Sequence, residues 1–386
     1  SFDFSPGQVL HLGGITVDSS GLYYFLGLIL LAAATAFAWN LRRTRAGRAM
    51  VALRAAQRST APFVVIAAIG APGLNILTGY AGQISLGHAA FLGVGAYTGA
   101  VLGADHGVSA FVWIPAAGVM AALLGAIVGP VALRLRGLYL AIVTLGLVFI
   151  AQHVFFNADG LTGGPQGRAF PAVQLGSFDF SPGQVLHLGG ITVDSSGLYY
   201  FLALILLAAA TAFAWNLRRT RAGRAMVALR EREAAAGVMG IDVGRLKVTA
   251  FVVSAAMAGV SGALYASYLS FAQPGQWSLL MSIQFIAAVI VGGLGTTAGP
   301  LLGCAVVFAL PSLLKELPFL PAEGSGGLSA SDLTSITYGL LIVAFLSFEP
   351  RGLLGIASRL RRSGNGSGAG SRASKLTVTT PEEAHP

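Results

Sequence analysis

The sequence is divided into apolar blocks that are long enough to cross a lipid bilayer as helices. A helix needs roughly 20 mostly apolar residues to cross the hydrocarbon layer. Only 10% of the 386 residues are charged, whereas an ordinary soluble domain has about a quarter, so too little charge remains to coat a soluble surface. The clearest blocks are 22–40, 62–79, 109–133, 137–156, 197–215, 249–270 and 279–297, and shorter ones are 88–104, 300–314 and 336–349. We therefore predict an all-α, polytopic transmembrane helical bundle of about 8–10 segments, because helices satisfy their backbone polar groups within lipid.

The placement of charge between the blocks predicts the orientation of the chain. The formal net charge is +9, which could suggest a nucleic-acid partner. However, 216–250 contains eight basic residues, whereas 157–196 contains one, Arg168. This asymmetry follows the rule that basic residues concentrate on the cytoplasmic side of a membrane protein. We expect 216–250 in the cytoplasm and 157–196 outside, and no nucleic-acid partner.

A near-exact duplication occupies the start of the chain. Residues 1–54 repeat 177–230 with a single difference, Gly27 in place of Ala203. Repeats of an ancient fold diverge much further, so this copy reflects a recent duplication, a gene-assembly error or a deliberate insertion. We treat 1–54 as a separate unit that adds one membrane segment.

The extra segment creates a conflict with the charge rule. If 22–40 ends inside and every later block crosses the bilayer, Arg134 and Arg136 fall outside. One solution is a broken or re-entrant helix between 62 and 104, where Pro72 and several glycines interrupt the apolar run. The other is that the first copy does not belong to the working fold.

The last residues differ in composition from the rest of the chain. Residues 357–386 are rich in Gly, Ser and polar residues and cannot bury enough apolar area to fold alone. We predict a disordered cytoplasmic tail.

The run from Arg224 to Met239 is compatible with a short cytoplasmic amphipathic helix between Gly223 and Gly240. Such a helix docks into a groove of a partner protein or lies on the lipid surface. Its uncharged residues are mostly Ala, Gly and Met rather than Trp, Phe and Leu, which favours close approach to a protein. The simpler alternative is a solvated helix held only by its own fold.

This run resembles the Glu-Ala-Ala coupling loop of ABC importer permeases. Further motifs resemble the LivM branch of the branched-chain amino acid permeases, in that family's order across 60–356, and they lie at 79–91, 136–146, 161–165, 250–265, 291–295 and 348–353. The chain departs from the family at Ala71-Pro72, where an alanine-leucine pair is usual, and at its leading spans, which the duplicated block replaces.

The resemblance implies that 60–356 is the permease domain of an importer in the bacterial cytoplasmic (inner) membrane. It implies three kinds of partner: a second, LivH-like permease, two ATP-binding subunits, and a periplasmic or extracellular solute-binding protein that delivers branched-chain or related amino acids. Transport would follow alternating access driven by the ATPases. The residues that the resemblance assigns to ATPase coupling are Gly223, Arg224, Arg230, Glu231, Arg232, Glu233, Ala234, Ala235 and Gly240.

Two glycine-rich segments are candidates for the translocation path. Glycines break a helix inside the membrane and leave backbone polar groups free, and transporters present such groups to substrates. Polar side chains at membrane depth add to this. The alternative is that the glycines serve packing and that His88 is a satisfied core histidine. The candidates are Gly79, Tyr80, Gly82, Gln83, Ser85, Gly87, His88, Gly292 and Gly293.

Other patterns exclude or weaken further functions. Gly95 and Gly99 form a small-xxx-small pattern that predicts close helix packing, and Cys304 is a small core residue. The chain has no phosphate-loop motif and no metal-ligand spacing among His11, His153 and His187. We therefore expect no catalytic residue, metal site or cofactor, and no enzymatic activity. The remaining alternatives are an ion-coupled secondary transporter or channel, and a non-functional duplication product.

Overall fold

The computed structural model describes residues 9–12, 15–18, 60–135, 137–170, 173–175, 178–179, 185–188, 191–315, 336 and 339–340. The predicted block 22–40 and the predicted tail 357–386 lie outside the described residues, as does nearly all of 336–349. The orientation and role of the first copy therefore stay predictions.

The described part of the chain is a helical bundle, which confirms the predicted fold class. Six of its helices are long and apolar enough to cross a membrane. They are α3 (Thr60–Leu74) with its extension η1 (Asn75–Tyr80), α5 (Ala110–Arg134), α6 (Leu138–Asn157), α8 (Ser195–Arg219), α11 (Val243–Tyr268) and α12 (Leu279–Gly292). The shorter blocks form α4 (His88–Ala100), which continues as η2 (Val101–Asp105), and α13 (Gly299–Lys315). These six and two helices account for eight of the ten predicted blocks.

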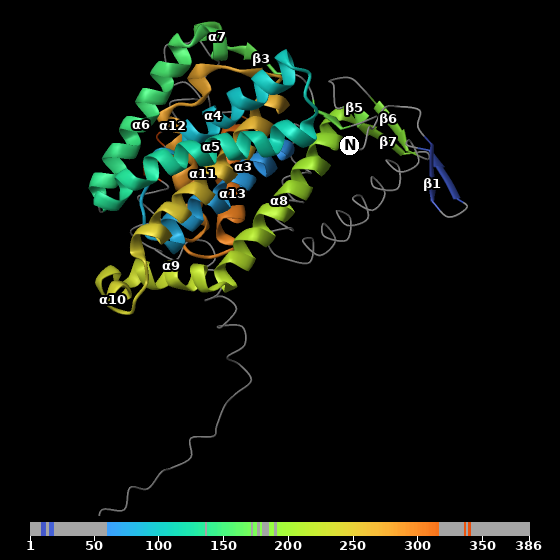
Figure 1. The fold of residues 1–386 in the computed structure, drawn as a ribbon. Coiled ribbons are helices and arrows are strands. Elements are labelled where there is room, and N and C mark those ends of the chain that lie inside the picture. Colours follow the sequence, from blue (N-terminus) through green and yellow to red (C-terminus); the bar gives the residue numbers. More distant parts are fainter. Residues whose placement is uncertain are drawn as a thin grey trace, which may run out of the picture.

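Helix α11 is the central helix of the bundle and packs against α3, α4 and α5 (Figure 1). Much of its surface consists of small residues, which allow neighbouring backbones to approach closely. A Cβ atom on Gly95 of α4 would overlap the backbone of Gly259 in α11. Gly95 therefore serves helix packing, as its spacing with Gly99 predicts.

Helix α3 runs antiparallel to α11 and ends in a break. Ser261 Oγ donates to the carbonyl of Ile66 at 2.8 Å. Further along α3, Gly73 lies against Ser254, which precedes Ser261 in α11. Pro72 lies inside α3 and removes a backbone donor from the helical ladder, and the chain continues as the π-helical turn η1. Residues 81–87 are not helical and α4 begins at His88, so the apolar run between 62 and 104 is interrupted between two helices.

The bundle has two distinct ends (Figure 1). At one end lie α9 (Arg221–Glu231) and α10 (Glu233–Val238), and at the other lie α7 (Asp159–Thr162) and a two-stranded sheet of β3 (Arg168–Ala169) with β8 (Phe271–Ala272). The short 3₁₀ turns η3 (Gly164–Gln166) and η4 (Pro274–Gln276) flank these strands in sequence.

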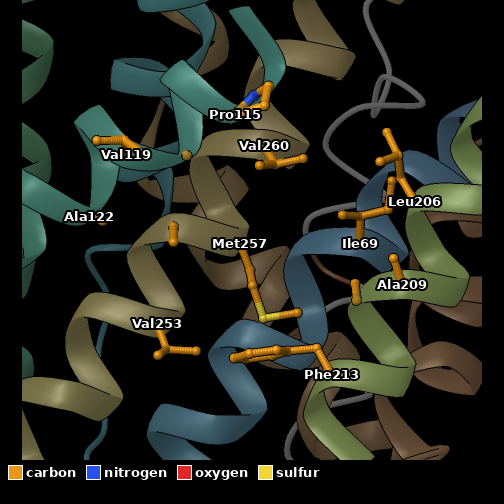
Figure 2. A pocket seen from close by; sticks show the side chains of 13 residues that line it. Ile69, Pro115, Val119, Ala122, Leu206, Ala209, Phe213, Val253, Met257 and Val260 are labelled. Atoms are coloured by element: carbon orange, nitrogen blue, oxygen red, sulfur yellow. The ribbon is translucent and has the colours of Figure 1, made fainter. Parts of the chain in front are cut away.

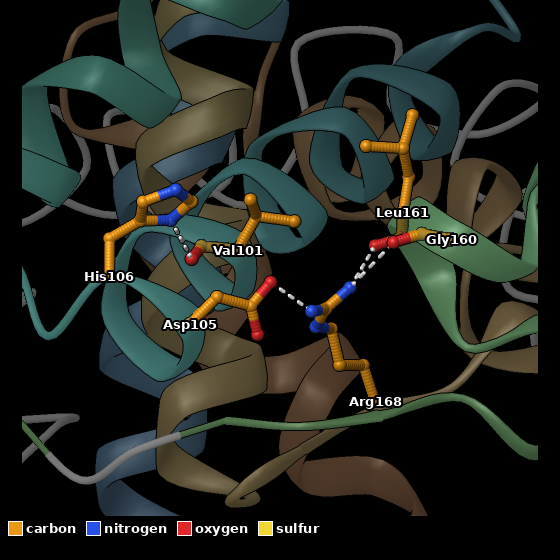
Figure 3. Close-up of polar contacts among 6 residues, drawn as sticks. All are labelled: Val101, Asp105, His106, Gly160, Leu161 and Arg168. Carbon is orange, nitrogen blue, oxygen red and sulfur yellow. Dashed lines mark hydrogen bonds and ion pairs between the residues drawn. The ribbon is translucent and has the colours of Figure 1, made fainter.

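An ion pair ties segments together at the α7 end. The guanidinium of Arg168 pairs with the carboxylate of Asp105 at the end of η2, and also donates to the carbonyls of Gly160 and Leu161 at 3.2 and 3.0 Å (Figure 3). His106 Nδ1 lies 3.1 Å from the carbonyl oxygen of Val101 in the same view. Arg168 thus holds the segment after α6 against the end of η2.

The two copies of the duplicated sequence form the same hairpin. Strand β1 (Val9–Leu12) pairs with β2 (Ile15–Asp18), and β6 (Val185–Leu188) pairs with β7 (Ile191–Asp194) in the equivalent register. A Gly-Gly pair stands between the strands of each copy, and such pairs favour two-residue hairpin turns. A third small pair joins β4 (Gln174–Leu175) and β5 (Phe178–Asp179). These hairpins were not predicted.

An apolar groove of about 420 Å³ lies between α3, α5, α8 and α11 (Figure 2). Ile69, Val119, Leu206, Phe213 and Met257 are among its lining residues, and Val119 and Phe213 are exposed. Its side chains offer no charged or hydrogen-bonding group to a polar cargo. The groove is therefore no candidate for the binding of an amino acid head group.

Candidate functional site

The predicted coupling helix is two helices, α9 and α10, rather than one. Thr220 caps the start of α9, because its hydroxyl accepts from the backbone N–H of Gly223 at 3.2 Å, as side-chain caps do at helix starts. Arg232 has an extended backbone (φ −151°, ψ 95°) and separates α9 from α10. The buried face of α9 contains Gly223, Met226 and Leu229. This face holds the segment against the end of the bundle.

Arg230 connects α9 to the break after α3. Its Nη1 donates to the carbonyl of Gly79 at 2.6 Å, and a Cβ atom on Gly82 would lie 3.0 Å from its Cγ. The predicted coupling residue and two predicted path residues are therefore in direct contact.

Asn75 links the same place to the loop between α12 and α13. Its side chain is buried. Its Oδ1 accepts from the N–H of Gly295 at 2.9 Å, and its Nδ2 donates to the carbonyl of Thr296 at 2.8 Å. We call Asn75, Gly79, Gly82, Arg230 and Gly295 the junction. The junction joins three segments that are far apart in sequence.

The predicted path residues Gly292 and Gly293 form the end of α12 and lead into this loop. Gly292 is the last residue of α12 and Gly293 its C-terminal cap. Thr296 Oγ1 donates to the carbonyl of Gly293 at 2.7 Å. The loop is thus held both by its own turn and by Asn75.

An ion pair next to the junction joins α10 to α11. Lys247 Nζ lies 2.7 Å from Glu233 Oε1, and the lysine side chain is only 7% exposed. A buried ammonium needs such a partner. Glu233, which the resemblance assigns to the ATPase surface, therefore faces α11.

The other predicted path residues surround the start of α4. Three hydroxyl groups accept hydrogen bonds from backbone N–H groups here. Thr144 Oγ1 accepts from Leu86 at 2.9 Å and Ser85 Oγ accepts from Gly87 at 3.2 Å. Ser282 Oγ accepts from Ala89 at 2.9 Å. These bonds satisfy amides that a helix start leaves without partners.

His88 and Tyr80 are both buried. The ring of His88 lies 4.7 Å from that of Phe285, and the guanidinium of Arg218 lies 5.8 Å from the Tyr80 ring. These packing contacts, like the hydroxyls at the start of α4, are structural, but His88 Nε2 and the Tyr80 hydroxyl have no hydrogen-bond partner among the described residues, so His88 is not the satisfied core histidine of the structural alternative.

The remaining coupling residues face outward. Arg224, Glu231, Arg232, Ala235 and Gly240 are exposed, and Arg224 Nη1 donates to the carbonyl of Arg219 at 2.8 Å. Ala234 lies in α10 by its backbone.

Two apolar side chains at the end of α10 were missed by sequence reasoning. Val238 and Met239 are 89% and 81% exposed, and we call this pair the apolar tip. Their position directly after the Glu-Ala-Ala motif was a signal that could have identified them.

The described residues contain no cluster of side chains that could bind a metal ion. Among 60–135, 137–170 and 191–315, no three His, Cys, Asp or Glu side chains lie close enough to hold a metal ion.

Comparison with known proteins gives the family. The model of the branched-chain amino acid transport system permease component matches residues 58–346. The chain is 32% identical to the high-affinity branched-chain amino acid transport system permease protein LivM of Escherichia coli, over 78% of this chain and 70% of that protein. It is 26% identical to LivH of the same organism over 53% of this chain and 62% of LivH.

A further relative carries a different name. The chain is 28% identical to the fructose import permease protein FruG of Bifidobacterium longum, over 74% of this chain and 79% of FruG. No solved structure matches the chain at a significant level. The match to most of the chain and the identity to LivM establish that this multi-pass membrane protein belongs to the branched-chain amino acid transport system permease family.

Proposed function

We propose that the chain is the permease subunit of an ABC importer in the bacterial cytoplasmic membrane, with branched-chain or related amino acids as its cargo. The observation that carries the proposal is the hydrogen bond from Arg230 to the Gly79 carbonyl. It connects the segment that resembles a coupling loop to the broken helix among the predicted path residues. Such a contact gives partner motion a route into the bundle.

The mechanism is alternating access, in which ATP binding and hydrolysis shift the bundle between two states. The ATPase moves α9 and α10, and Arg230 passes this motion to the break and, through Asn75, to the loop before α13. Glu233 then acts inside the permease, whereas Arg230 is exposed and reaches the break with its guanidinium. The contact with the ATPase falls to the exposed Glu231, Arg232 and apolar tip.

The partners follow from the family: a LivH-like permease, two ATP-binding subunits and a solute-binding protein. LivH is itself among the relatives, so we propose that a permease related to this chain is its partner. The FruG relative is named for fructose import, so the fold alone does not fix the cargo. We assign amino acids because LivM matches with the higher identity.

Family membership disfavours the ion-coupled transporter or channel, because the relatives are transport-system permeases. The same relatives disfavour a non-functional duplication product, although residues 1–54 repeat 177–230.

The test uses the apolar tip. Met239→Glu places a charge on a side chain that is 81% exposed, so folding is unaffected while docking into an apolar groove is opposed. We expect the amount of ATPase subunit that co-purifies with the full-length variant to fall about tenfold or more. A charge without a partner in a protein interface costs more than about 1.4 kcal/mol, which corresponds to a tenfold loss of affinity.

Leu161→Glu is the matched control, because Leu161 is also an exposed apolar residue but lies at the α7 end. It should retain the ATPase as the unchanged protein does. Equal ATPase retention by both variants would contradict the assigned role of the α9–α10 segment.

A further inference from the structure

A polar cavity of about 150 Å³ lies beside the junction, at the α9 end of the bundle. It is lined by the break after η1, the turn and first residues of α6 after α5, the α9–α10 connection and the second turn of α11, and it is open on one side. Its polar lining comes from Gln83, Arg230, Glu233 and Lys247, and apolar contact comes from Leu140 and Leu229.

Gln83 contributes an unpartnered amide to the lining of the cavity. The residue is 5% exposed, and neither its Nε2 nor its Oε1 has a hydrogen-bond partner among the described residues. Buried polar atoms in folded proteins nearly always have partners. The amide offers one donor group and one acceptor, so the missing partner must both accept and donate hydrogen bonds.

The charges around the cavity have both signs. Arg230 and Lys247 are cations, and Glu233 is an anion that pairs with Lys247 at 2.7 Å. A simple anion would be repelled by Glu233, and a simple cation by Arg230 and Lys247. A small zwitterion matches both signs, with its carboxylate toward the cations and its ammonium toward Glu233 and Gln83 Oε1.

We infer that this cavity binds the zwitterionic head group of a free α-amino acid that enters from the α9 side. The inference rests on the proposed function in one respect, because that function supplies an amino acid at this face of the membrane. A cavity of about 150 Å³ takes a ligand of benzene size, which suits the head group, while the side chain extends through the open side. A bound amino acid would contact both the α9–α10 connection and the break.

The experiment measures equilibrium binding to the full chain, with the subunits that co-purify, in lipid nanodiscs without ATP or binding protein. The probes are L-leucine, isocaproate, which lacks the ammonium, and isoamylamine, which lacks the carboxylate. We expect L-leucine to bind at least tenfold more tightly than either analogue.

Gln83→Leu removes both unpartnered amide atoms and keeps a similar volume, so it leaves no new unsatisfied group. We expect it, and Lys247→Met, to weaken L-leucine binding at least tenfold. Gln166→Leu is the matched control, because this glutamine is exposed in η3 at the other end, and it should bind as the unchanged protein does.

Equal binding of leucine and isocaproate, or unchanged leucine binding in Gln83→Leu, would overturn the inference. ATP-driven uptake in proteoliposomes separates it from the proposed function. Uptake without binding at this cavity refutes the inference alone, whereas binding that Gln83→Leu abolishes, in a complex without uptake, refutes the importer function alone.

Discussion

Arg230 is the side chain on which the contact between α9 and the rest of the bundle depends. Arg230→Ala removes its hydrogen bond to Gly79, and a hydrogen bond from a charged group contributes about 1.5–3 kcal/mol. We expect the amount of cargo taken up per ATP hydrolysed to fall about tenfold or more, with ATP hydrolysis retained. Paired uptake and ATPase assays in proteoliposomes measure this ratio.

Arg221→Ala is the control for Arg230→Ala, because Arg221 is an exposed arginine of the same helix. It should leave the ratio unchanged. If the two variants behave alike, Arg230 does not transmit motion.

Gly82 combines a left-handed backbone with a neighbouring side chain. Its φ is +70°, and a side chain in this conformation costs roughly 1–2 kcal/mol. Gly82→Ala also places a Cβ atom 3.0 Å from Arg230 Cγ. We expect lower thermal stability in detergent and a lower uptake per ATP.

Gly107→Ala separates these two effects. Gly107 has a similar φ of +61°, with no atom within 4 Å of the added Cβ. It should lose stability but keep uptake per ATP. A loss of uptake per ATP in both variants would assign the Gly82 effect to backbone strain alone.

The residue types of the junction could be predicted from the sequence, but their contacts could not. Gly79, Gly82 and Arg230 belong to motifs that resemble the family, whereas Arg230 and Gly79 are 151 positions apart. Asn75 and Lys247 were not predicted to be site residues. In the sequence, a lone polar residue near the end of a span looks the same whether its side chain is solvated or bound to a partner.

At the scale of elements, α11 is held by small residues rather than by large apolar side chains. Gly259→Leu would force a side chain into α5, since a Cβ atom on Gly259 would lie 2.5 Å from the carbonyl oxygen of Ala117. Overpacking costs about 1–3 kcal/mol or more. We expect a clearly lower melting temperature in detergent and reduced yield of folded protein.

Gly146→Leu is the matched control within a membrane helix. Gly146 lies in α6 with no atom within 4 Å of an added Cβ, and replacing glycine in a helix gains up to about 1 kcal/mol. This variant should be as stable as the unchanged protein or more stable. A similar loss in both variants would show that helix packing at Gly259 is not tight.

Membrane spans were predictable because length and apolar composition define them without reference to neighbours. The coupling segment was predicted as one helix because Arg232 and its flanking residues all favour helices. The extended backbone at Arg232 follows from tertiary contacts, namely Arg230 to Gly79 on one side and Glu233 to Lys247 on the other. The hairpins were missed because four-residue strands give a weak periodic signal.

At the scale of the whole molecule, the course of α3 bears on the first copy. Because α3 runs antiparallel to α11 and ends at the junction, it begins at the α7 end. The charge rule places the arginines that precede it at the opposite end. The broken helix therefore does not remove the conflict, since α3 and α4 both run between the two ends.

Deletion of 1–54 tests the first copy directly. We expect the shortened chain to insert into the membrane and to support uptake at the level of the full chain, because α8 and α9 already supply the equivalent segment. Protease accessibility of the α9–α10 segment in spheroplasts and uptake assays are the measurements. Loss of insertion would instead show that the first copy supplies a needed span.

The central position of α11 also has a consequence for synthesis. Its partners α3, α4 and α5 are translated first, and α5 ends at Arg134 whereas α11 begins at Val243. At a translation rate of about 5–20 residues per second, the ribosome needs roughly 5–20 s to reach α11. During that interval three helices wait in the bilayer with their small-residue faces uncovered. We therefore expect a nascent chain that stops before Val243 to lack the helix against which α3, α4 and α5 pack.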